Sequence, residues 1–408
     1  MSSGAYTTRI VDPVLDELLD NAPAVLITGP RACGKTTTAG RRAQTIVRLD
    51  VPAEAAQFHS DPDAALRRLE PPVLIDEWQN VPAVLPAIKR LTDEGSEPGG
   101  FILTGSIRFH HAPELWPGTG RIARLRMFGL TEAELAGGPD LDVLIPRLVD
   151  GELQGPRSPE DLPGYLSRAV RGGMPTPALG ERTGARWYGD YLEQFVDSDL
   201  ASAGATVDGG RLMAYLMALA ENTAGAPSDA TLYTAAGVTA KTARRYDELL
   251  AGLGIVDLAP AWTTNRIKRL SSRRKVYMTD TGLTAAALQA DVDDILADGH
   301  LFGRMIDSFV AAQLRPVLAA TRRRTLHHVR SSDGRHEVDL LIDLGHRGVV
   351  AIEIKAAAAV TAKDARHLTW LRDSLGSRFA RGIVLHTGPT TFELGDRIVA
   401  APISALWA

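Results

Sequence analysis

The sequence contains a single cysteine, Cys33, among 408 residues. One thiol cannot form an internal disulfide, so a cross-linked secreted scaffold is excluded and we expect a reducing, cytosolic setting. No apolar run approaches the roughly 18 residues that a membrane helix requires, and the N-terminus has no signal-peptide core. The sequence therefore favours a cytoplasmic protein without a membrane contact.

Neither sign of charge dominates the chain. It carries 45 lysine and arginine residues against 49 aspartate and glutamate residues, for a formal net charge of −4. A surface coated for nucleic acid would be strongly basic, so any such contact must be confined to a local patch. With 45% hydrophobic and 23% charged residues, the chain can bury ordinary cores and should divide into two or three domains.

A phosphate-binding pattern stands near the N-terminus. The apolar run 24–27 leads into a loop that matches GxxxxGK[ST] and consists of Gly29, Pro30, Arg31, Ala32, Cys33, Gly34, Lys35 and Thr36, followed by Thr37. The glycines let backbone N–H groups face inward, the lysine reaches the β- and γ-phosphates, and the threonine hydroxyl ligates Mg²⁺. Residues 29–37 are therefore predicted to bind ATP with Mg²⁺.

Two further strand-like segments supply groups for hydrolysis. The segment 73–77 ends in Asp76, which would hold Mg²⁺ directly or through water, and Glu77, which is placed to polarise the attacking water. The strand 101–104 leads to Ser106, whose hydroxyl we prefer to that of Thr104 as the group that senses the γ-phosphate. Strands and helical stretches alternate from residue 24 to residue 104, which predicts a parallel sheet with its ligand at the carboxyl ends of the strands.

Three arginines, Arg121, Arg124 and Arg126, follow the last of these strands. Arg121 is a candidate for an arginine that reaches the γ-phosphate of a neighbouring subunit in a homo-oligomer and stabilises transition-state charge. The alternative is a surface arginine that is solvated or paired with an acid.

The motifs GPRACGKTTT at 29–38, VLIDEWQN at 73–80, FILTGS at 101–106 and GR at 120–121 resemble those of bacterial and archaeal AAA-type ATPases that carry a conserved C-terminal region of unknown function. The resemblance continues through landmarks at 171–175, 191–200, 275–283 and 303–310, so it covers nearly the whole chain. It implies ATP binding and hydrolysis. One position departs from the pattern, because Asp307 stands where such proteins usually have the longer glutamate.

Residues 231–253 have the pattern of a helix-turn-helix, with a turn at 237–238 and Thr239 as the cap of the second helix. The strand-like segments 255–258 and 276–278 would form the two sides of a wing. Basic residues lie between or beside them: Arg266, Lys268, Arg269, Arg273, Arg274 and Lys275.

A recognition helix presents its N-terminal residues to the major groove of DNA. Here these residues are Lys241, Thr242, Arg244 and Arg245, and the basic wing would contact phosphates. The alternative is a winged helix that packs or docks proteins, because the acids at 247–248 interrupt the positive face.

Two strand patterns, 337–343 and 349–355, face each other around a turn near His346. In the symmetric hairpin register Asp339 lies opposite Glu353, close enough for the two carboxylates to share one Mg²⁺, and Lys355 lies on the same face. This arrangement resembles the PD-(D/E)xK nuclease fold. The alternative is a surface hairpin with a cross-strand salt bridge between Glu337 and Lys355.

We therefore expect an α/β protein with a P-loop parallel sheet and flanking helices at 1–165, a helical and winged-helix region at 166–285, and a small α/β nuclease-like domain at 286–408. The predicted function is a Mg²⁺-dependent ATPase that couples ATP hydrolysis to DNA binding or processing by its C-terminal half. Nuclease activity stays open. The alternative is a nucleotide-dependent switch or scaffold for protein partners, with an inactive nuclease-like fold.

Overall fold

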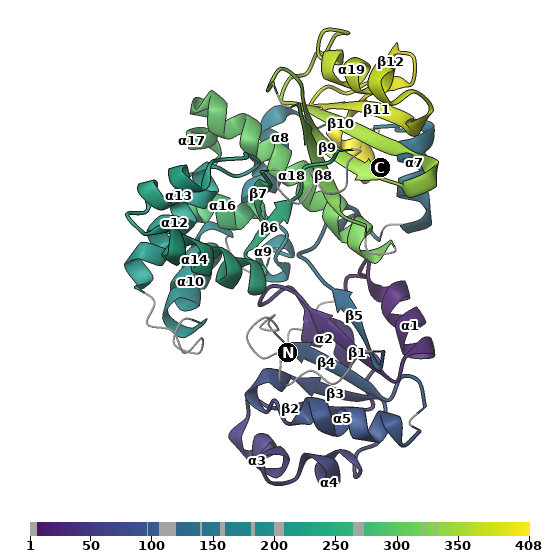
Figure 1. Cartoon of the computed structure of the whole chain (residues 1–408), viewed down its shortest axis with the longest axis vertical. Coiled ribbons are helices and arrows are strands. Elements are labelled where there is room, and N and C mark those ends of the chain that lie inside the picture. The colour runs from purple at the N-terminus through teal and green to yellow at the C-terminus, as the bar shows by residue number, and fades with distance from the viewer. Residues whose placement is uncertain are drawn as a thin grey trace. The chain divides into compact units, whose positions relative to one another are not determined.

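The structure is a computed structural model that describes residues 6–95, 97–105, 120–138, 141–155, 160–180, 184–199, 208–263, 273–321, 324–331 and 333–408. The chain forms two compact units. The first comprises residues 1–130 and 249–255, and the second comprises residues 131–248 and 256–408. Figure 1 labels the elements of both units.

The first unit contains a five-stranded sheet in the order β2-β3-β4-β1-β5 (Figure 1). All four pairings are parallel. The strands are β1 (Ala24–Thr28), β2 (Thr45–Arg48), β3 (Val73–Asp76), β4 (Phe101–Gly105) and β5 (Ile122–Arg126). The three central strands are buried along nearly their whole length, as expected for a parallel sheet covered on both faces, whereas the edge strands β2 and β5 alternate. The predicted parallel sheet is confirmed.

Short helices connect and cover these strands. They are α1 (Asp12–Asn21), α2 (Lys35–Gly40), α3 (Pro52–Ser60), α4 (Pro62–Leu66) and α5 (Val84–Asp93). The longest apolar stripe belongs to α5, where Leu85, Ile88 and Leu91 recur at three- and four-residue spacing and are buried. On its exposed side Lys89 pairs with Asp93 at 2.6 Å. This amphipathic pattern explains why α5 packs with one face toward the core.

The second unit begins with helices and ends with a mixed sheet. The helices are α6 (Glu132–Leu135), α7 (Leu141–Asp150), α8 (Leu162–Arg171), α9 (Pro175–Ala178), α10 (Gly184–Gln194), α12 (Gly209–Glu221), α13 (Asp229–Ala235), α14 (Ala240–Gly252), α16 (Thr281–Leu288), α17 (Val292–Ala297), α18 (Gly299–Ala320) and α19 (Arg366–Leu375). The last turn of α14, from Leu249 onward, is counted with the first unit. A π-helical turn, Phe195–Asp199, continues α10. In the part of the chain that the structure describes, every helix falls short of the length or apolar character needed to cross a bilayer.

The predicted helix-turn-helix corresponds to α13 and α14. Gly237 lies between them with φ 62°, a left-handed conformation that favours glycine. The hydroxyl of Thr239 accepts a hydrogen bond from the backbone N–H of Thr242 at 3.2 Å and so caps α14. The next two strands, β6 (Val256–Ala259) and β7 (Lys275–Met278), pair in antiparallel fashion. Arg266, Lys268 and Arg269 of the expected wing lie outside the described residues.

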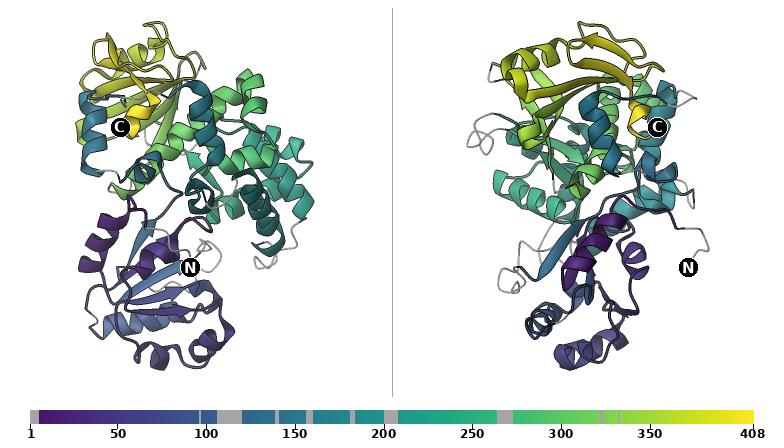
Figure 2. Two further views of the ribbon diagram at one scale, coloured as in Figure 1. Left: turned by 180° about the vertical axis from the view of Figure 1, so that it is seen from behind. Right: turned by 90° about the vertical axis from the view of Figure 1, so that its right-hand side faces the viewer.

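The six-stranded sheet has the order β12-β13-β11-β10-β9-β8. Its strands are β8 (Leu326–Arg330), β9 (Glu337–Asp343), β10 (Val349–Lys355), β11 (Phe379–His386), β12 (Phe392–Gly395) and β13 (Ile398–Pro402). The β9–β10 hairpin has the expected register, since Leu340 pairs with Ile352 and Asp343 with Val349. Figure 2 shows α7 beside this sheet, where Arg381 of β11 donates to the backbone oxygens of α7 residues Val149 and Asp150.

One backbone bridge joins the β6–β7 region to the sheet. Ala261 pairs with His328 of β8, and the N–H of Trp262 donates to the carbonyl of His328 at 2.7 Å.

His328 is 1% exposed, and its Nε2 lies 3.0 Å from the carbonyl oxygen of Arg273. Burial lowers the pKa of His328 from its usual value of 6.5 to about 4, and the nearby Lys275 charge acts in the same direction.

This depressed pKa predicts acid sensitivity. Below pH 6.5 the unfolded chain takes up a proton at this histidine while the folded chain does not, so stability is lost as the pH falls toward 4. From pH 8 to pH 5, the free energy of unfolding of the parent should fall by about 2 kcal/mol more than that of His328→Gln, which keeps a polar side chain but cannot titrate. Urea unfolding at both pH values measures this difference. Equal losses in the two proteins would contradict the assignment.

Candidate functional site

The P-loop lies between β1 and α2 in the first unit. Gly34 has φ 98°, in the left-handed region that favours glycine. Gly29 is required for a different reason. A Cβ atom at this position would stand 2.4 Å from the carbonyl oxygen of Met127, so no larger residue fits. The two glycines therefore serve different purposes: one turns the chain into the helix and the other lets the loop pass close to the segment after β5.

Lys35 is the first residue of α2, and only 7% of it is exposed. Its Nζ donates to the carbonyl oxygens of Gly29 at 3.1 Å and Pro30 at 2.8 Å. In the described part of the chain its partners are thus neutral carbonyls of its own loop. A buried ammonium that lacks an anionic partner is well suited to bind phosphate.

Thr36 and Asp76, which come from α2 and β3, meet at the carboxyl edge of the sheet. The Thr36 hydroxyl donates to Asp76 Oδ1 at 2.9 Å. Asp76 is 8% exposed. A hydroxyl beside a carboxylate is the ligand pair that P-loop proteins offer to Mg²⁺, so these two residues fit the expected metal.

Thr104 also donates its hydroxyl to Asp76 Oδ1. The β3–β4 register places Thr104 directly beside Asp76, and it is fully buried. Thr104 therefore orients the carboxylate, a role that the sequence interpretation missed when it preferred Ser106. Ser106 itself lies outside the described residues. The signal that identifies Thr104 is the register of two neighbouring parallel strands.

Glu77 immediately follows β3 and has φ 53°, an uncommon value for a non-glycine residue. The side-chain amide of Gln79 donates to its carboxylate. The Gln79 side chain lies close against the end of β4, since a Cβ atom at Gly105 would meet Gln79 Oε1 at 2.3 Å. Gln79 thus positions the predicted general base, and sequence reasoning did not identify it.

Arg9 is a second residue that sequence reasoning missed. It is 6% exposed and donates to the carbonyls of Cys33 at 2.9 Å and Phe128 at 2.8 Å. These contacts tie the P-loop to the chain after β5. Cys33 is fully buried, as expected for a small filler inside the loop.

A second cluster of charges lies in the second unit, where β7, α18 and β9 meet. Lys275 Nζ stands 2.8 Å from Asp307 Oδ2, 3.4 Å from Asp339 Oδ1 and 3.3 Å from the Asp339 carbonyl oxygen. Burial lowers the pKa of Lys275, but the surrounding groups, Asp307 first among them, together raise the pKa by more, and the net pKa is well above its usual value. Lys275 therefore keeps its charge.

This location corrects one expectation from the sequence. Lys275 was grouped with the basic wing that would contact phosphates, yet it is 2% exposed. The reason is that β7 lies against two carboxylates that are distant in sequence, the buried Asp307 and the partly buried Asp339, and the buried ammonium forms ion pairs with both. Arg273 and Arg274, just before it, are exposed.

Glu353 and Lys355 complete the cluster from β10. Lys355 Nζ lies 3.8 Å from Glu353 Oε1, and Glu337 pairs in register with Arg330 of β8. The structure therefore has a contact between Lys355 and Glu353 of the same strand where the sequence analysis considered a cross-strand salt bridge between Glu337 and Lys355. Burial and the neighbouring Asp339 raise the pKa of Glu353 well above its usual range. Among the described residues there is no group of three or more histidine, cysteine, aspartate or glutamate side chains that could hold a metal ion.

Residues 21–136 match the family model of an AAA domain. Over these residues the first unit is therefore similar to AAA-type P-loop ATPase domains, and we call it the AAA domain. Residues 163–294 and 302–406 match two other models, each described as a domain of unknown function (DUF8612 and DUF4143).

Two relatives span most of the chain. Uncharacterised proteins of Mycobacterium bovis and Mycobacterium tuberculosis are each 29% identical to it over 396 residues, which make up 95% of this chain and 82% of each relative. Among solved structures, a Walker-type ATPase of Pyrococcus abyssi has 15% identity and a TM-score of 0.39, with 68% of this chain and 94% of that chain covered.

In the AAA domain, the predicted trans-acting Arg121 is already paired. Its Nε donates to Asp93 at 2.8 Å, and its side chain is 49% exposed. This contact matches the surface alternative considered for it. To act on a neighbour's nucleotide, Arg121 would have to exchange this carboxylate for phosphate.

The predicted recognition residues lie on the first two turns of α14. Lys241, Arg244 and Arg245 are exposed, and Thr242 is half-buried. Asp247 turns inward, where its carboxylate accepts a hydrogen bond from Tyr215 at 2.7 Å. Of the two acids expected to interrupt the positive face, only Glu248 is exposed.

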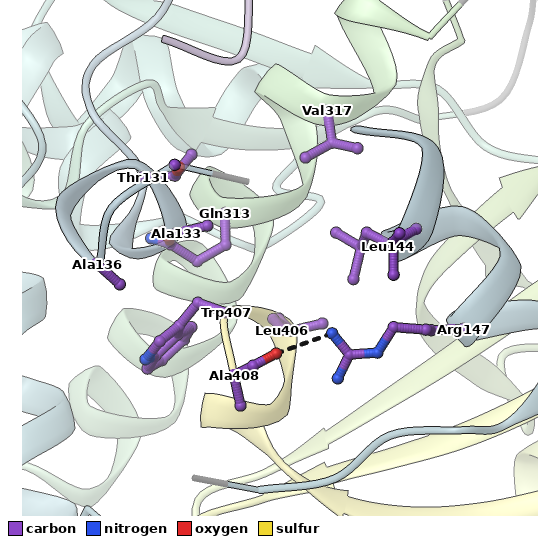
Figure 3. Close-up of a pocket in the computed structure, with 12 residues that line it drawn as sticks. Thr131, Ala133, Ala136, Leu144, Arg147, Gln313, Val317, Leu406, Trp407 and Ala408 are labelled. Carbon is purple, nitrogen blue, oxygen red and sulfur yellow. Dashed lines mark hydrogen bonds between the residues drawn. The ribbon is translucent and has the colours of Figure 1, made fainter. Parts of the chain in front are cut away.

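The second unit also contains a pocket of about 250 Å³ among α6, α7, α18 and the last residues of the chain (Figure 3). Its polar side chains already have partners: Gln313 accepts from the Glu132 N–H at 2.8 Å, and Arg147 donates to the Ala408 carbonyl at 2.9 Å. None of the residues selected from the sequence lines it. We therefore do not assign a function to this pocket.

Proposed function

We propose that this protein is a Mg²⁺-dependent ATPase that couples ATP hydrolysis to DNA binding by its C-terminal half. The observation that carries the ATPase part is the buried Lys35 ammonium, which the described residues surround with carbonyls rather than carboxylates. An ATP phosphate would supply the missing negative charge.

The proposed roles follow from the positions of the side chains. Residues 29–37 wrap the phosphates, and Lys35 transfers its hydrogen bonds from the loop carbonyls to the β- and γ-phosphate oxygens. Thr36 and Asp76 hold Mg²⁺, which neutralises developing charge when bound. Glu77, oriented by Gln79, accepts a proton from the attacking water.

A matched pair of variants separates binding from hydrolysis. Lys35→Ala should weaken ATP binding at least tenfold because it removes the phosphate-binding charge. Glu77→Gln should keep the ATP Kd within a few-fold of the parent but lower turnover by roughly 10²-fold or more, the usual contribution of a general base. Calorimetric titration and phosphate release measure the two effects.

Lys89→Ala is the control, because Lys89 is a half-exposed lysine on α5 that pairs with Asp93. It should match the parent in both assays. Equal turnover by Glu77→Gln and the parent would remove Glu77 from its role, and unchanged ATP affinity in Lys35→Ala would contradict the P-loop assignment.

The DNA part of the proposal is supported by the exposed cations at the start of α14. Lys241, Arg244 and Arg245 point away from the core, and the inward turn of Asp247 leaves their face more positive than the sequence indicated. The exposed Arg273 and Arg274 precede β7 in the same unit. Basic side chains on the N-terminal turns of such a helix are typical of major-groove contacts.

Binding of duplex DNA across a salt series tests this part. The parent should bind at low salt with an affinity that falls as salt rises, and Lys241→Ala/Arg244→Ala should reduce the slope of log K against log[salt] by about 1 to 2 units. Arg186→Ala, at an exposed position on α10, should keep the parent slope. An absence of binding at low salt, or a flat response, would favour the second candidate function, a nucleotide-dependent scaffold for protein partners.

A further inference from the structure

We infer that the Lys275 ammonium occupies the cation position of the C-terminal carboxylate cluster, so that this cluster binds no divalent metal and instead ties the β6–β7 hairpin to the six-stranded sheet. This inference stands independently of the ATPase proposal. It also decides against the shared Mg²⁺ that the hairpin register predicted for Asp339 and Glu353.

The hydrogen bonds of Lys275 are the first support. An ammonium has three N–H donors, and three oxygens surround this one: Asp307 Oδ2 at 2.8 Å, the Asp339 carbonyl at 3.3 Å and Asp339 Oδ1 at 3.4 Å. The side chain is 3% exposed. Lys275 is therefore a fully bonded, buried cation between two carboxylates, which is the place that a metal ion would need.

The remaining oxygens of the two carboxylates are also engaged. Asp307 Oδ1 accepts from the Tyr277 hydroxyl at 3.0 Å, and Asp339 Oδ2 accepts from the backbone N–H of Ile354 at 3.0 Å. Mg²⁺ requires near-octahedral oxygen coordination with several ligands or waters. Here the candidate ligands already accept hydrogen bonds from donors in β7 and β10, and Lys275 adds positive charge that repels a second cation.

Glu353 does not restore a metal site. It is 3% exposed, and its Oε1 faces the Lys355 ammonium at 3.8 Å. Its Oε2 has no hydrogen-bond partner in the described part of the chain. One free carboxyl oxygen offers far fewer ligands than a divalent ion requires, and displacing Lys275 would leave a buried ammonium without its counter-charge.

The same contacts explain what the cluster does. Lys275 belongs to β7, Asp307 to α18 and Asp339 to β9, so three elements distant in sequence meet at one charge. Removing one member of a buried ion pair leaves the others uncompensated, which makes such a contact specific for one arrangement of the chain. The cluster therefore fixes the hairpin that follows α14 against the sheet, in parallel with the Ala261–His328 bridge.

The test uses the full chain without nucleotide, in an Asp76→Asn background that removes the proposed metal ligand of the AAA domain. Thermal unfolding is followed in millimolar Mn²⁺ and in chelator. We expect the two melting temperatures to agree within about 1 °C, because the C-terminal cluster offers the ion no site in the folded state. A clear gain in Mn²⁺ that disappears when Asp339→Asn is added would overturn the inference.

Two lysine variants in the same background complete the test. Lys275→Met keeps the length of the side chain but leaves two buried carboxylates unpaired, so it should melt several degrees lower and should gain melting temperature in Mn²⁺. Lys355→Met is the matched control at a half-buried lysine of the same cluster, and it should change the melt little and give no Mn²⁺ response. The assignment of Lys275 to the cation position would be contradicted if Lys275→Met had the same melting temperature as Lys355→Met. It would also be contradicted if Lys275→Met had a lower melting temperature that did not rise in Mn²⁺.

If Lys275→Met does not fold, the double variant Lys275→Met/Asp307→Asn provides the test. It removes one positive and one negative charge together, and it should fold with a melting temperature closer to the parent. Failure of this double variant to fold would contradict a role that depends on charge balance. A folded double variant beside an unfolded single one would support it.

Discussion

A charge that is withdrawn from water is stabilised by a counter-charge, and the two buried lysines described here differ in whether the fold supplies one. In the described structure Lys35 contacts carbonyl oxygens of its own loop, whereas Lys275 lies between the carboxylates of Asp307 and Asp339. The first lysine still lacks an anion and can accept a phosphate. The second is neutralised within the fold, so it stabilises the chain instead of binding a ligand.

The two compact units differ in the same way, because charged side chains are left available to a ligand in the first unit and are paired with one another in the second. In the AAA domain, the carboxyl edge of a parallel sheet gathers Thr36, Asp76 and Glu77, with Thr104 and Gln79 holding the two acids in place. In the second unit, a comparable set of charged residues is closed by internal ion pairs. Chemistry at a phosphoanhydride is therefore supported in the first unit, and the second unit offers exposed cations on α14 for a partner.

The sequence was sufficient where the relevant information is local. The P-loop spacing, the apolar runs that became β1, β3 and β4, and the β9–β10 register are all set by neighbouring residues or by one short turn. It was insufficient where a partner comes from far along the chain. Lys275 appears in the sequence as one more wing cation, because nothing in its surroundings reveals that Asp307 and Asp339 will reach it. The predicted boundary after residue 285 even separates this lysine from both partners. The contact of Thr104 with Asp76 was missed for the same reason, since Thr104 reaches the carboxylate from a neighbouring strand.

The proposed coupling between ATP hydrolysis in the AAA domain and DNA binding by the second unit can be measured directly. The measurement is the steady-state rate of phosphate release at saturating ATP, with and without saturating duplex DNA at low salt. We expect DNA to change the rate of the parent, and we expect Lys241→Ala/Arg244→Ala to need more DNA for the same change. An ATPase rate that stays the same at every DNA concentration would contradict it.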